Sequence, residues 1–254
     1  MSLERNLPWL VIVGLFVVWE AAVRLFDIPP FILPRPSAFF EALWIWRWEI
    51  AVHSAQTFMT TIVGFALAMA AGMALGVAIG SSALLYRGLY SLLIGFNTIP
   101  KVAIVPILVM WFGIGSVPAI ITAFLISFFP IVVNVATGIA TVEPELQDVL
   151  RALGARKRDI LVKIGIPRSL PYYFASLKIA ITFAFVGSIV SENVAANSGI
   201  GHLMTVASSR FETPLAFAAL FVIALMGVLM YVVTAMVEKR LTGWSVRGMH
   251  LSAG

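Results

Sequence analysis

Six polar side chains lie within stretches that are otherwise apolar, and they are the residues best suited to handle a solute. A charged or amide group in a lipid-facing stretch is costly unless it lines a water-filled space or finds a partner. Lys178 and Glu192 are fourteen residues apart, close to four helical turns, so they share one helix face with each other and roughly with Ser188 and Ser191. We expect a solute path lined by Lys101, Asn134, Lys178, Ser188, Ser191 and Glu192.

A structural interpretation of these residues stays open beside the functional one. Lys178 can extend its ammonium group to the cytoplasmic headgroups, and Glu192 can lie at the external rim. Lys101 follows Pro100 in an interrupted apolar stretch, and broken helices at membrane depth border protein or a water-filled cavity. The two lysines would suit an anionic solute.

Catalytic and metal chemistry find little support in the sequence. There is no cysteine, and the three histidines, His53, His202 and His250, lie far from clustered carboxylates. The G-x-x-x-x-G-K-[ST] loop that holds nucleotide phosphates is absent as well. We therefore expect no catalytic residue, no metal site, no cofactor on this chain and no enzymatic activity.

The elements that position these residues are expected to be membrane helices. Hydrophobic residues make up 61% of the chain, charged residues 11%, and the mean hydropathy is +1.00. A helix needs about 20 apolar residues to cross the hydrocarbon core. Six stretches qualify, so the sequence predicts an all-α membrane protein with a single transmembrane domain over residues 1–254: Pro8–Phe26, Thr57–Gly80, Leu89–Phe112 (interrupted by Pro100 and Pro106), Val117–Ile139, Leu170–Ser191 and Pro214–Val237.

Basic residues predict the orientation of these six spans. Both termini and the loops after spans two and four lie on one side, together with eleven of the seventeen lysines and arginines. Because basic residues favour the cytoplasm, we expect both termini there, and we attribute the net charge of +5 to topology instead of to a nucleic-acid partner. The eleven are Arg5, Arg87, Arg151, Arg156, Lys157, Arg158, Lys163, Arg168, Lys239, Arg240 and Arg247.

A charged stretch, Glu145–Pro167, separates spans four and five on that side. Its apolar residues Leu146, Val149, Leu150 and Leu153 follow helical spacing, and Gly154 comes where a left-handed glycine commonly ends a helix. A second short helix follows, and Pro167 and Pro171 are expected to mark the turn toward span five. The pair either rests on anionic lipid or docks into another protein.

The spacing in this stretch resembles the EAA loop of permeases in ATP-binding-cassette (ABC) importers, E-A-A-x3-G-x9-I-x-L-P. Gly154, Ile164 and Pro167 match, whereas Asp148 replaces the glutamate, Val149 and Leu150 the alanines, and Ile166 the leucine. Four further segments are similar to the nitrate, sulfonate and taurine branch of that family: Ile32–Trp44, Ile99–Gly115, Phe128–Asn134 and Ser198–Met204.

The resemblance implies a type I importer permease (MetI-like) fold of six helices in the bacterial inner membrane, with a cytoplasmic coupling loop over residues 143–168. It also implies a homodimer, two ATPase subunits that carry ATP and Mg²⁺, and a periplasmic or lipid-anchored binding protein that delivers a small, anionic solute such as a sulfonate, taurine, nitrate or a related organic acid. The alternative is a secondary transporter driven by an ion gradient. The residues implied in ATPase coupling are Asp148, Val149, Leu150, Arg151, Leu153, Gly154, Ala155, Arg158, Ile164 and Pro167.

Small residues recur every fourth position in span two, at Gly64, Ala68, Gly72, Gly76 and Gly80. Such a row lets two helix backbones approach closely. The sequence leaves open whether the partner helix belongs to the same chain or to a second copy.

Overall fold

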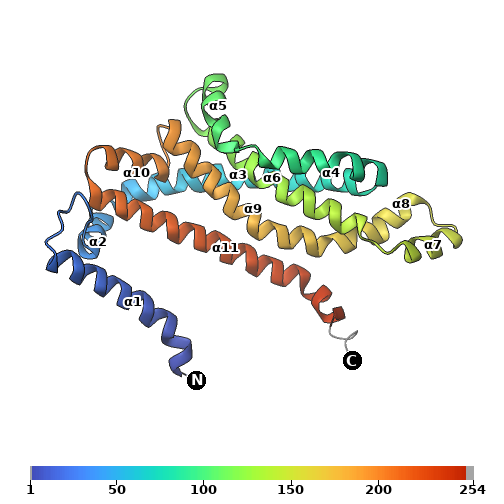
Figure 1. The fold of residues 1–254 in the computed structure, drawn as a ribbon, viewed down its shortest axis with the longest axis horizontal. Helices are drawn as coiled ribbons and strands as arrows, with labels where there is room; N and C mark the ends of the chain where they lie inside the picture. Colours follow the sequence, from blue (N-terminus) through green and yellow to red (C-terminus); the bar gives the residue numbers. More distant parts are fainter. Residues whose placement is uncertain (1, 250–254) are drawn as a thin grey trace.

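The computed structural model describes residues 2–249, without the side chains of 2–6, 8, 9, 90, 144 and 242–249. The side chains of Arg5 and Arg247 and the whole of His250 therefore lie outside the described residues. All regular secondary structure in residues 2–249 is helical (Figure 1). The predicted fold class is thus confirmed at the level of its elements.

Long apolar helices account for most of the predicted spans. In the described part of the chain, four helices are long and apolar enough to cross a membrane, or five if one bent pair is counted as a span. They include α3 (Arg47–Gly80), α6 (Ser116–Ala140) and α11 (Thr213–Met249), while α1 (Ser2–Leu25) covers the first predicted span. Helix α3 begins ten residues before the predicted start at Thr57.

The bent pair is the predicted third span, and its proline positions explain the break. Helix α4 (Ala83–Thr98) ends before Pro100, then a 3-10 turn η1 (Lys101–Ile104) leads into α5 (Val105–Phe112) at an angle of 73°. Ile99 adopts an extended conformation with ψ of 126°, as expected for a residue that precedes proline.

Helices α3, α6 and α9 (Ile166–Ala195) form the core, which is dense because small residues line the α3–α6 contact. A Cβ atom added at Gly72 would lie 2.7 Å from Ile131 Cγ2, and one at Gly76 would lie 2.6 Å from Val135 Cβ. The small-residue row of α3 therefore packs on α6 of the same chain, which settles the question that the sequence left open.

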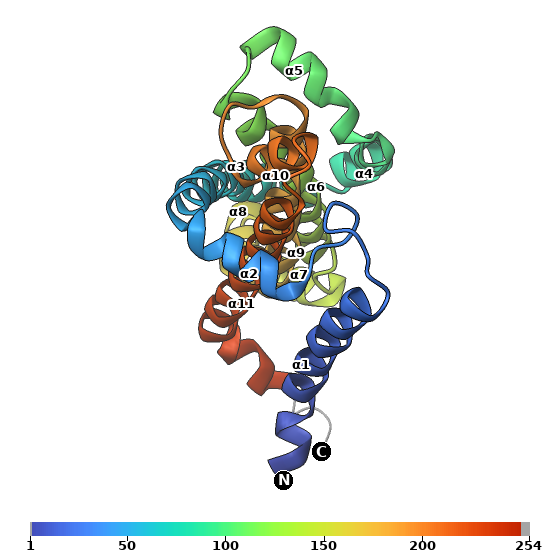
Figure 2. The ribbon, with the colours of Figure 1, turned by 90° about the vertical axis from the view of Figure 1, so that its left-hand side faces the viewer.

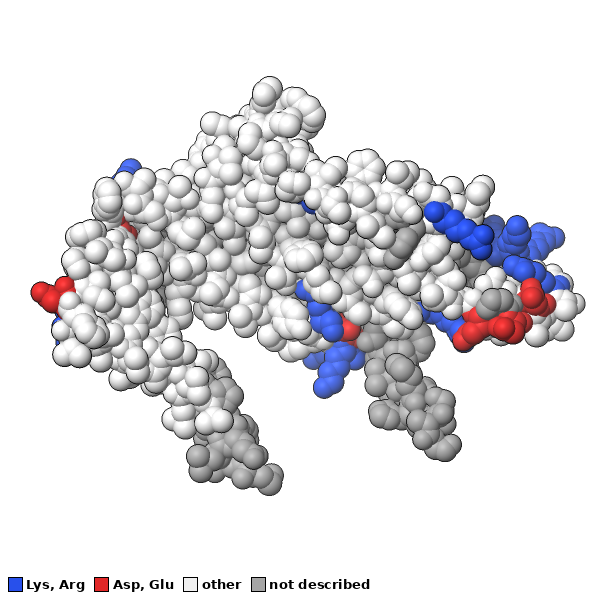
Figure 3. All heavy atoms as spheres, in the orientation of Figure 1, with Lys and Arg blue, Asp and Glu red and all other residues white. Residues whose placement is uncertain are grey.

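Short helices lie at both ends of this core. Helices α2 (Pro36–Ile45) and α10 (Ile200–Ser209) lie at one end, and α7 (Pro144–Ala152) and α8 (Lys157–Ile160) at the other (Figure 1). Viewed from the α2 end, α1 projects from one side of the core and α5 from the opposite side (Figure 2). On the face shown in Figure 3, charged side chains gather at the two ends and in a small group at the lower middle edge, and the rest of the surface is mostly uncharged.

The predicted turn at Pro167 and Pro171 is wrong, because the chain stays helical through both prolines. Helix α8 continues through a π-helical turn, Leu161–Gly165, into α9. Pro167 directly follows the π turn, in which the Ile166 N–H bonds to the Leu161 carbonyl. This wider turn relieves the clash that a proline ring usually makes with a preceding carbonyl.

Candidate functional site

Helix α7 ends as the sequence predicts, at a glycine in the left-handed region. Gly154 has a φ of +83°, and its N–H donates to the carbonyl of Arg151 at 3.0 Å. The Ala155 N–H then reaches back to the Leu150 carbonyl at 2.9 Å. These two bonds close the helix end, so the direction of the chain after α7 depends on a backbone conformation that side chains disfavour.

One face of α7 carries exposed apolar side chains. Val149 is 57% exposed and Leu153 is 78% exposed, whereas Leu146 and Leu150 are half-buried. Residues four positions apart lie on the same side of a helix, so Val149 and Leu153 make one small apolar face. At an end of a membrane protein where charged side chains gather, such a face is typical of a docking site.

Ion pairs hold this loop in place. Arg151 donates to the Asp148 carboxylate at 2.9 Å and to Gln147 Oε1 at 3.2 Å, all within α7. Arg168, in the first turns of α9, forms a salt bridge with Glu143, which immediately precedes α7. The base of the loop is therefore tied to the start of α9.

The predicted coupling residues separate into three groups. Asp148, Val149, Arg151, Leu153, Gly154 and Arg158 are exposed on α7, on α8 or in the turn between them. Leu150 and Ala155 are half-buried beside them. Ile164 and Pro167 belong instead to the helical run that leads into α9, and both are half-buried. Only the first group offers side chains to a partner.

At the opposite end of the core, Glu192 of α9 is the centre of a buried polar seam between α3, α9 and α10. It is 2% exposed, and its Oε2 atom accepts hydrogen bonds from Thr57 Oγ1 at 2.8 Å and from the Gly201 N–H at 3.1 Å. Thr57 Oγ1 accepts in turn from the Ile200 N–H at 2.8 Å. This chain of bonds fixes the N-terminal turn of α10 against both core helices.

The serines expected on the solute path lie in the same seam. Ser188 Oγ accepts from Thr60 Oγ1 at 3.3 Å, and Ser191 is 1% exposed. Together with Glu192 they are buried between α9 and α3, so no open path runs past them in the described chain.

The other path candidates lie elsewhere. Lys178 forms a 2.7 Å salt bridge with Glu238 of α11, so Lys178 and Glu192 occupy different helix contacts. Lys101 donates to the carbonyl and side-chain oxygens of Asn97 at 2.8 and 2.9 Å, and its ammonium lies 4.7 Å from the ring centre of Phe129. Asn134 donates to the Pro130 carbonyl within α6. A shared path for all six residues stays a prediction.

Sequence reasoning missed the partners of Glu192. Thr57 lies 135 residues away from it, and helix α10 was not predicted at all. The glycines at 199 and 201 are the available signal, since a Cβ at Gly199 would lie 2.2 Å from the Glu192 carboxyl carbon.

Two histidines lie beside the N-terminal turn of α10. His53 Nδ1 accepts a hydrogen bond from the Gly199 N–H at 3.0 Å, and its ring centre lies 6.2 Å from that of His202. Burial lowers the pKa of His202 from its ordinary value, and the nearby His53 adds to this lowering. No group of three or more metal-ligating side chains occurs among the residues described.

The amino-acid sequence is similar to a family of membrane transport proteins. Residues 68–243 match the family described as binding-protein-dependent transport system inner membrane component. The chain is 32% identical over 237 residues to the riboflavin transport system permease protein RibX of Chloroflexus aurantiacus, covering 91% of this chain and 87% of RibX. It is 28% identical over 245 residues to the putative aliphatic sulfonates transport permease protein SsuC of Escherichia coli, covering 96% and 93%.

A solved structure supports the fold. The chain is similar to a chain of the MetNI methionine ABC transporter in an inward-facing conformation, with a TM-score of 0.61 and 19% identity. The match covers 79% of this chain and 97% of that one. At this identity the similarity concerns the fold, which is the predicted MetI-like arrangement.

Proposed function

Because the chain belongs to the binding-protein-dependent transport system inner membrane component family, we propose that α7 is the helix through which a separate ATPase drives it. The chain is a multi-pass membrane protein and a permease subunit of a type I ABC importer. In this proposal residues 1–254 form one permease domain, and residues 143–168 are its cytoplasmic coupling loop.

The exposed apolar face of α7 is the observation that carries the proposal. Val149 and Leu153 leave apolar surface in water at the end of the molecule where charge gathers. Burying a valine or leucine side chain stabilises a contact by roughly 1.5–3 kcal/mol. A cleft on an ATPase subunit would cover both side chains, and the charged groups of Asp148, Arg151 and Arg158 would surround them.

The proposed assembly has two permease copies, two ATPase subunits and a binding protein. ATP and Mg²⁺ bind to the ATPase subunits, and none is expected on this chain. The permease lies in the bacterial inner membrane in contact with lipid, with both termini and α7 in the cytoplasm, while α2 and α10 face the binding protein outside. Nucleic acid has no role.

Transport follows from alternating access in this assembly. ATP binding draws the ATPase subunits together, α7 moves with them, and the core helices turn the path from inside to outside. The nucleotide must favour one state and the released solute the other, since equal affinity for both would shift nothing.

For the cargo we propose a small polar solute, and we favour an anion because Lys101 lies in the broken third span and forms no salt bridge in the described part of the chain. Relatives named for aliphatic sulfonates support that class. A relative named for riboflavin instead favours a heteroaromatic vitamin or its precursor as the second candidate class. Selectivity rests largely with the binding protein in this scheme.

An ion-driven secondary transporter is the alternative function. It needs a carboxylate that binds and releases a coupling ion during the cycle. Glu20 and Glu192 lie near the ends of the first and fifth predicted spans, and Glu238 of α11 is paired with Lys178. Glu192 is held by hydrogen bonds from Thr57 and Gly201. Because these hydrogen bonds already occupy Glu192, the carboxylate is poorly placed to bind and release an ion, which favours the ATP-driven scheme.

The test replaces the apolar face of α7 and follows ATPase attachment. Val149→Asp and Leu153→Asp should lower co-purification of the ATPase and ATP-driven uptake into vesicles by more than about 10-fold, because each removes roughly 1.5–3 kcal/mol of apolar contact. Gly154→Leu should have the same effect by redirecting the chain after α7, and Asp148→Lys should do so by reversing a charge at the contact.

Val162→Asp is the matched control, because Val162 is 52% exposed in the same loop but belongs to the π turn before α9, outside the α7 face that the proposal assigns to the ATPase contact. It should leave attachment and uptake at the wild-type level. Uptake that persists without ATPase, or full attachment of Val149→Asp and Leu153→Asp, would refute the proposal.

A further inference from the structure

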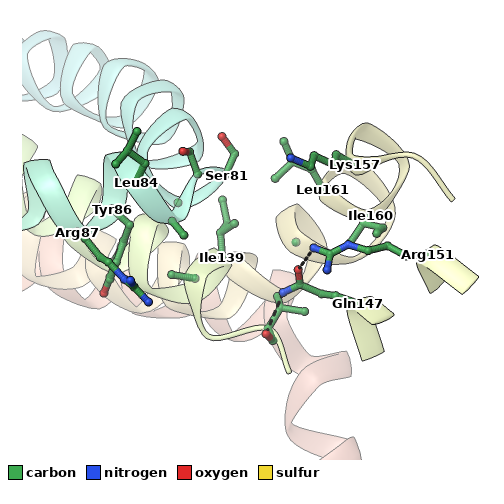
Figure 4. A pocket seen from close by; sticks show the side chains of 16 residues that line it. Ser81, Leu84, Tyr86, Arg87, Ile139, Gln147, Arg151, Lys157, Ile160 and Leu161 are labelled. Atoms are coloured by element: carbon green, nitrogen blue, oxygen red, sulfur yellow. Dashed lines mark hydrogen bonds between the residues drawn. The ribbon is translucent and has the colours of Figure 1, made fainter. Parts of the chain in front are cut away.

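A pocket of about 690 Å³ lies between the start of α4 and the coupling loop (Figure 4). Its cations do not converge on one point, because the Arg87 guanidinium lies beside Tyr86 and Lys157 lies on the opposite side of the space. This pocket therefore does not hold an anion from two sides. The bend between α4 and α5 differs, because there Lys101 and Asn97 are in direct contact.

Lys101 lies at that bend, midway along the predicted third span. It comes twelve residues after Leu89 and eleven before Phe112. An ammonium group at such a depth is costly if lipid surrounds it. The helix is broken at this point, and broken helices at membrane depth border protein or a water-filled cavity. Lys101 is therefore expected to face water or another protein chain, and not lipid.

The last turn of α4 and a ring of α6 hold the ammonium group in place. Lys101 Nζ donates to the Asn97 carbonyl at 2.8 Å and to Asn97 Oδ1 at 2.9 Å. It also lies 4.7 Å from the ring centre of Phe129, which is within the range of a cation–π contact. All of these partners are neutral, so they orient the ammonium group without cancelling its charge.

The group keeps a full positive charge and free donors. Lys101 forms no salt bridge in the described part of the chain, whereas Lys178 is paired with Glu238. An ammonium group has three N–H donors, and Asn97 accepts from two of them. The exposed Asn97 side chain uses its oxygen on Lys101, which leaves its NH₂ group for another acceptor.

We propose that Lys101 and Asn97 bind the anionic group of the solute, a sulfonate, a carboxylate or nitrate, on its way through the membrane. Such a group carries at least two acceptor oxygens, so one anion accepts from the third N–H of Lys101 and from the Asn97 amide together. The proposal rests on the anionic cargo of the proposed function and assigns the residues that recognise its charge.

The test uses the purified full chain in detergent. Because the chain contains no cysteine, Thr98→Cys places a single reporter thiol next to Asn97, at an exposed position. The rate at which neutral N-ethylmaleimide modifies this thiol reports whether the site is occupied. Sodium methanesulfonate should slow the reaction about 10-fold at roughly ten times its Kd, because only unoccupied chains react. Dimethyl sulfone, its neutral counterpart, should not slow it.

Two variants of the reporter chain test the residues themselves. Lys101→Gln removes the charge and should abolish the protection by methanesulfonate. Asn97→Asp keeps a side-chain oxygen acceptor for Lys101 but neutralises the ammonium group, and it should abolish protection too. Unfolding temperatures close to that of the reporter chain would show that both variants fold.

A second reporter controls for the added salt. Thr182→Cys, exposed on α9, should react at the same rate with and without methanesulfonate. The site would be refuted by an absence of protection in the Thr98→Cys chain, by equal protection from dimethyl sulfone, or by unchanged protection in a folded Lys101→Gln or Asn97→Asp chain. The measurement involves no ATPase, so failure here leaves the role of α7 intact, and failure of ATPase attachment leaves this site intact.

Discussion

Glu192 of α9 and Thr57 of α3 are joined by a 2.8 Å hydrogen bond at a point where both side chains are buried. The same hydroxyl of Thr57 accepts the Ile200 N–H, so one side chain fixes three helices. We therefore regard this pair as the main polar contact at the α10 end of the core.

Thr57→Val should destabilise the protein by about 1–3 kcal/mol, because it leaves the buried Ile200 N–H without its partner and removes one of the two hydrogen bonds that Glu192 Oε2 accepts. Thermal unfolding in detergent measures the loss. Thr182→Val is the matched control, since Thr182 is exposed on α9 and bonds only within its own helix. Equal unfolding temperatures for the two variants would contradict the assigned role.

Gly72→Ala and Gly76→Ala should each cost about 1–3 kcal/mol, because the added Cβ atom would lie 2.7 Å or less from side-chain atoms of α6. Gly88→Ala and Gly95→Ala on α4 meet nothing within 4 Å and should be neutral or slightly stabilising. Unfolding measurements on these four variants test the α3–α6 contact. If only the two α4 variants lost stability and Gly72→Ala and Gly76→Ala did not, the row of small residues on α3 would not pack on α6.

Lys178→Ala should lower both stability and uptake without reducing ATPase attachment, because its partner Glu238 of α11 would be left in a partly buried position. A double-mutant cycle with Glu238→Ala should give a coupling energy of about 1 kcal/mol or more. Lys178→Glu/Glu238→Lys, which reverses the pair, should recover part of the stability. Additive losses in the cycle would mean that the two charges do not interact.

Acidification should loosen the contact between α10 and α3. The pKa of His202 is lowered in the folded protein, so the unfolded state, with a pKa of about 6.5, binds more protons as the pH falls below that value. Stability from His202 is thus present above about pH 6.5 and is lost as the pH falls toward the folded pKa. His202→Gln should unfold with a weaker pH dependence than wild type between pH 7.5 and 5.5, and identical profiles would exclude this contribution.

The sequence predicts the membrane helices well because their signal is local. A run such as Ser116–Ala140 is apolar over its whole length, and its limits lie within one residue of the predicted Val117–Ile139. Gly154 was likewise placed correctly, since a glycine directly after an amphipathic run commonly has the left-handed conformation found here.

Contacts between distant segments could not be predicted in the same way. The seam at Glu192 joins residues far apart in sequence, and nothing in the local pattern around Thr57 identifies its partner. The prediction that Lys178 and Glu192 share one helix face considered α9 alone. In the structure Lys178 contacts α11 and Glu192 contacts α3. The predicted turn at Pro167 was wrong for a related reason. The π turn that accommodates this proline has no sequence signal of its own.

The unbroken helical run from Lys157 to Ala195 has 39 residues, which corresponds to a length of about 58 Å. A bilayer with its headgroups is about 40–45 Å thick, so this helical run is longer than the bilayer is thick. A tilt of about 5° would displace one end relative to the other by about 5 Å over such a length. A small rotation at the Lys157 end of this run would therefore move Glu192, which lies near its other end.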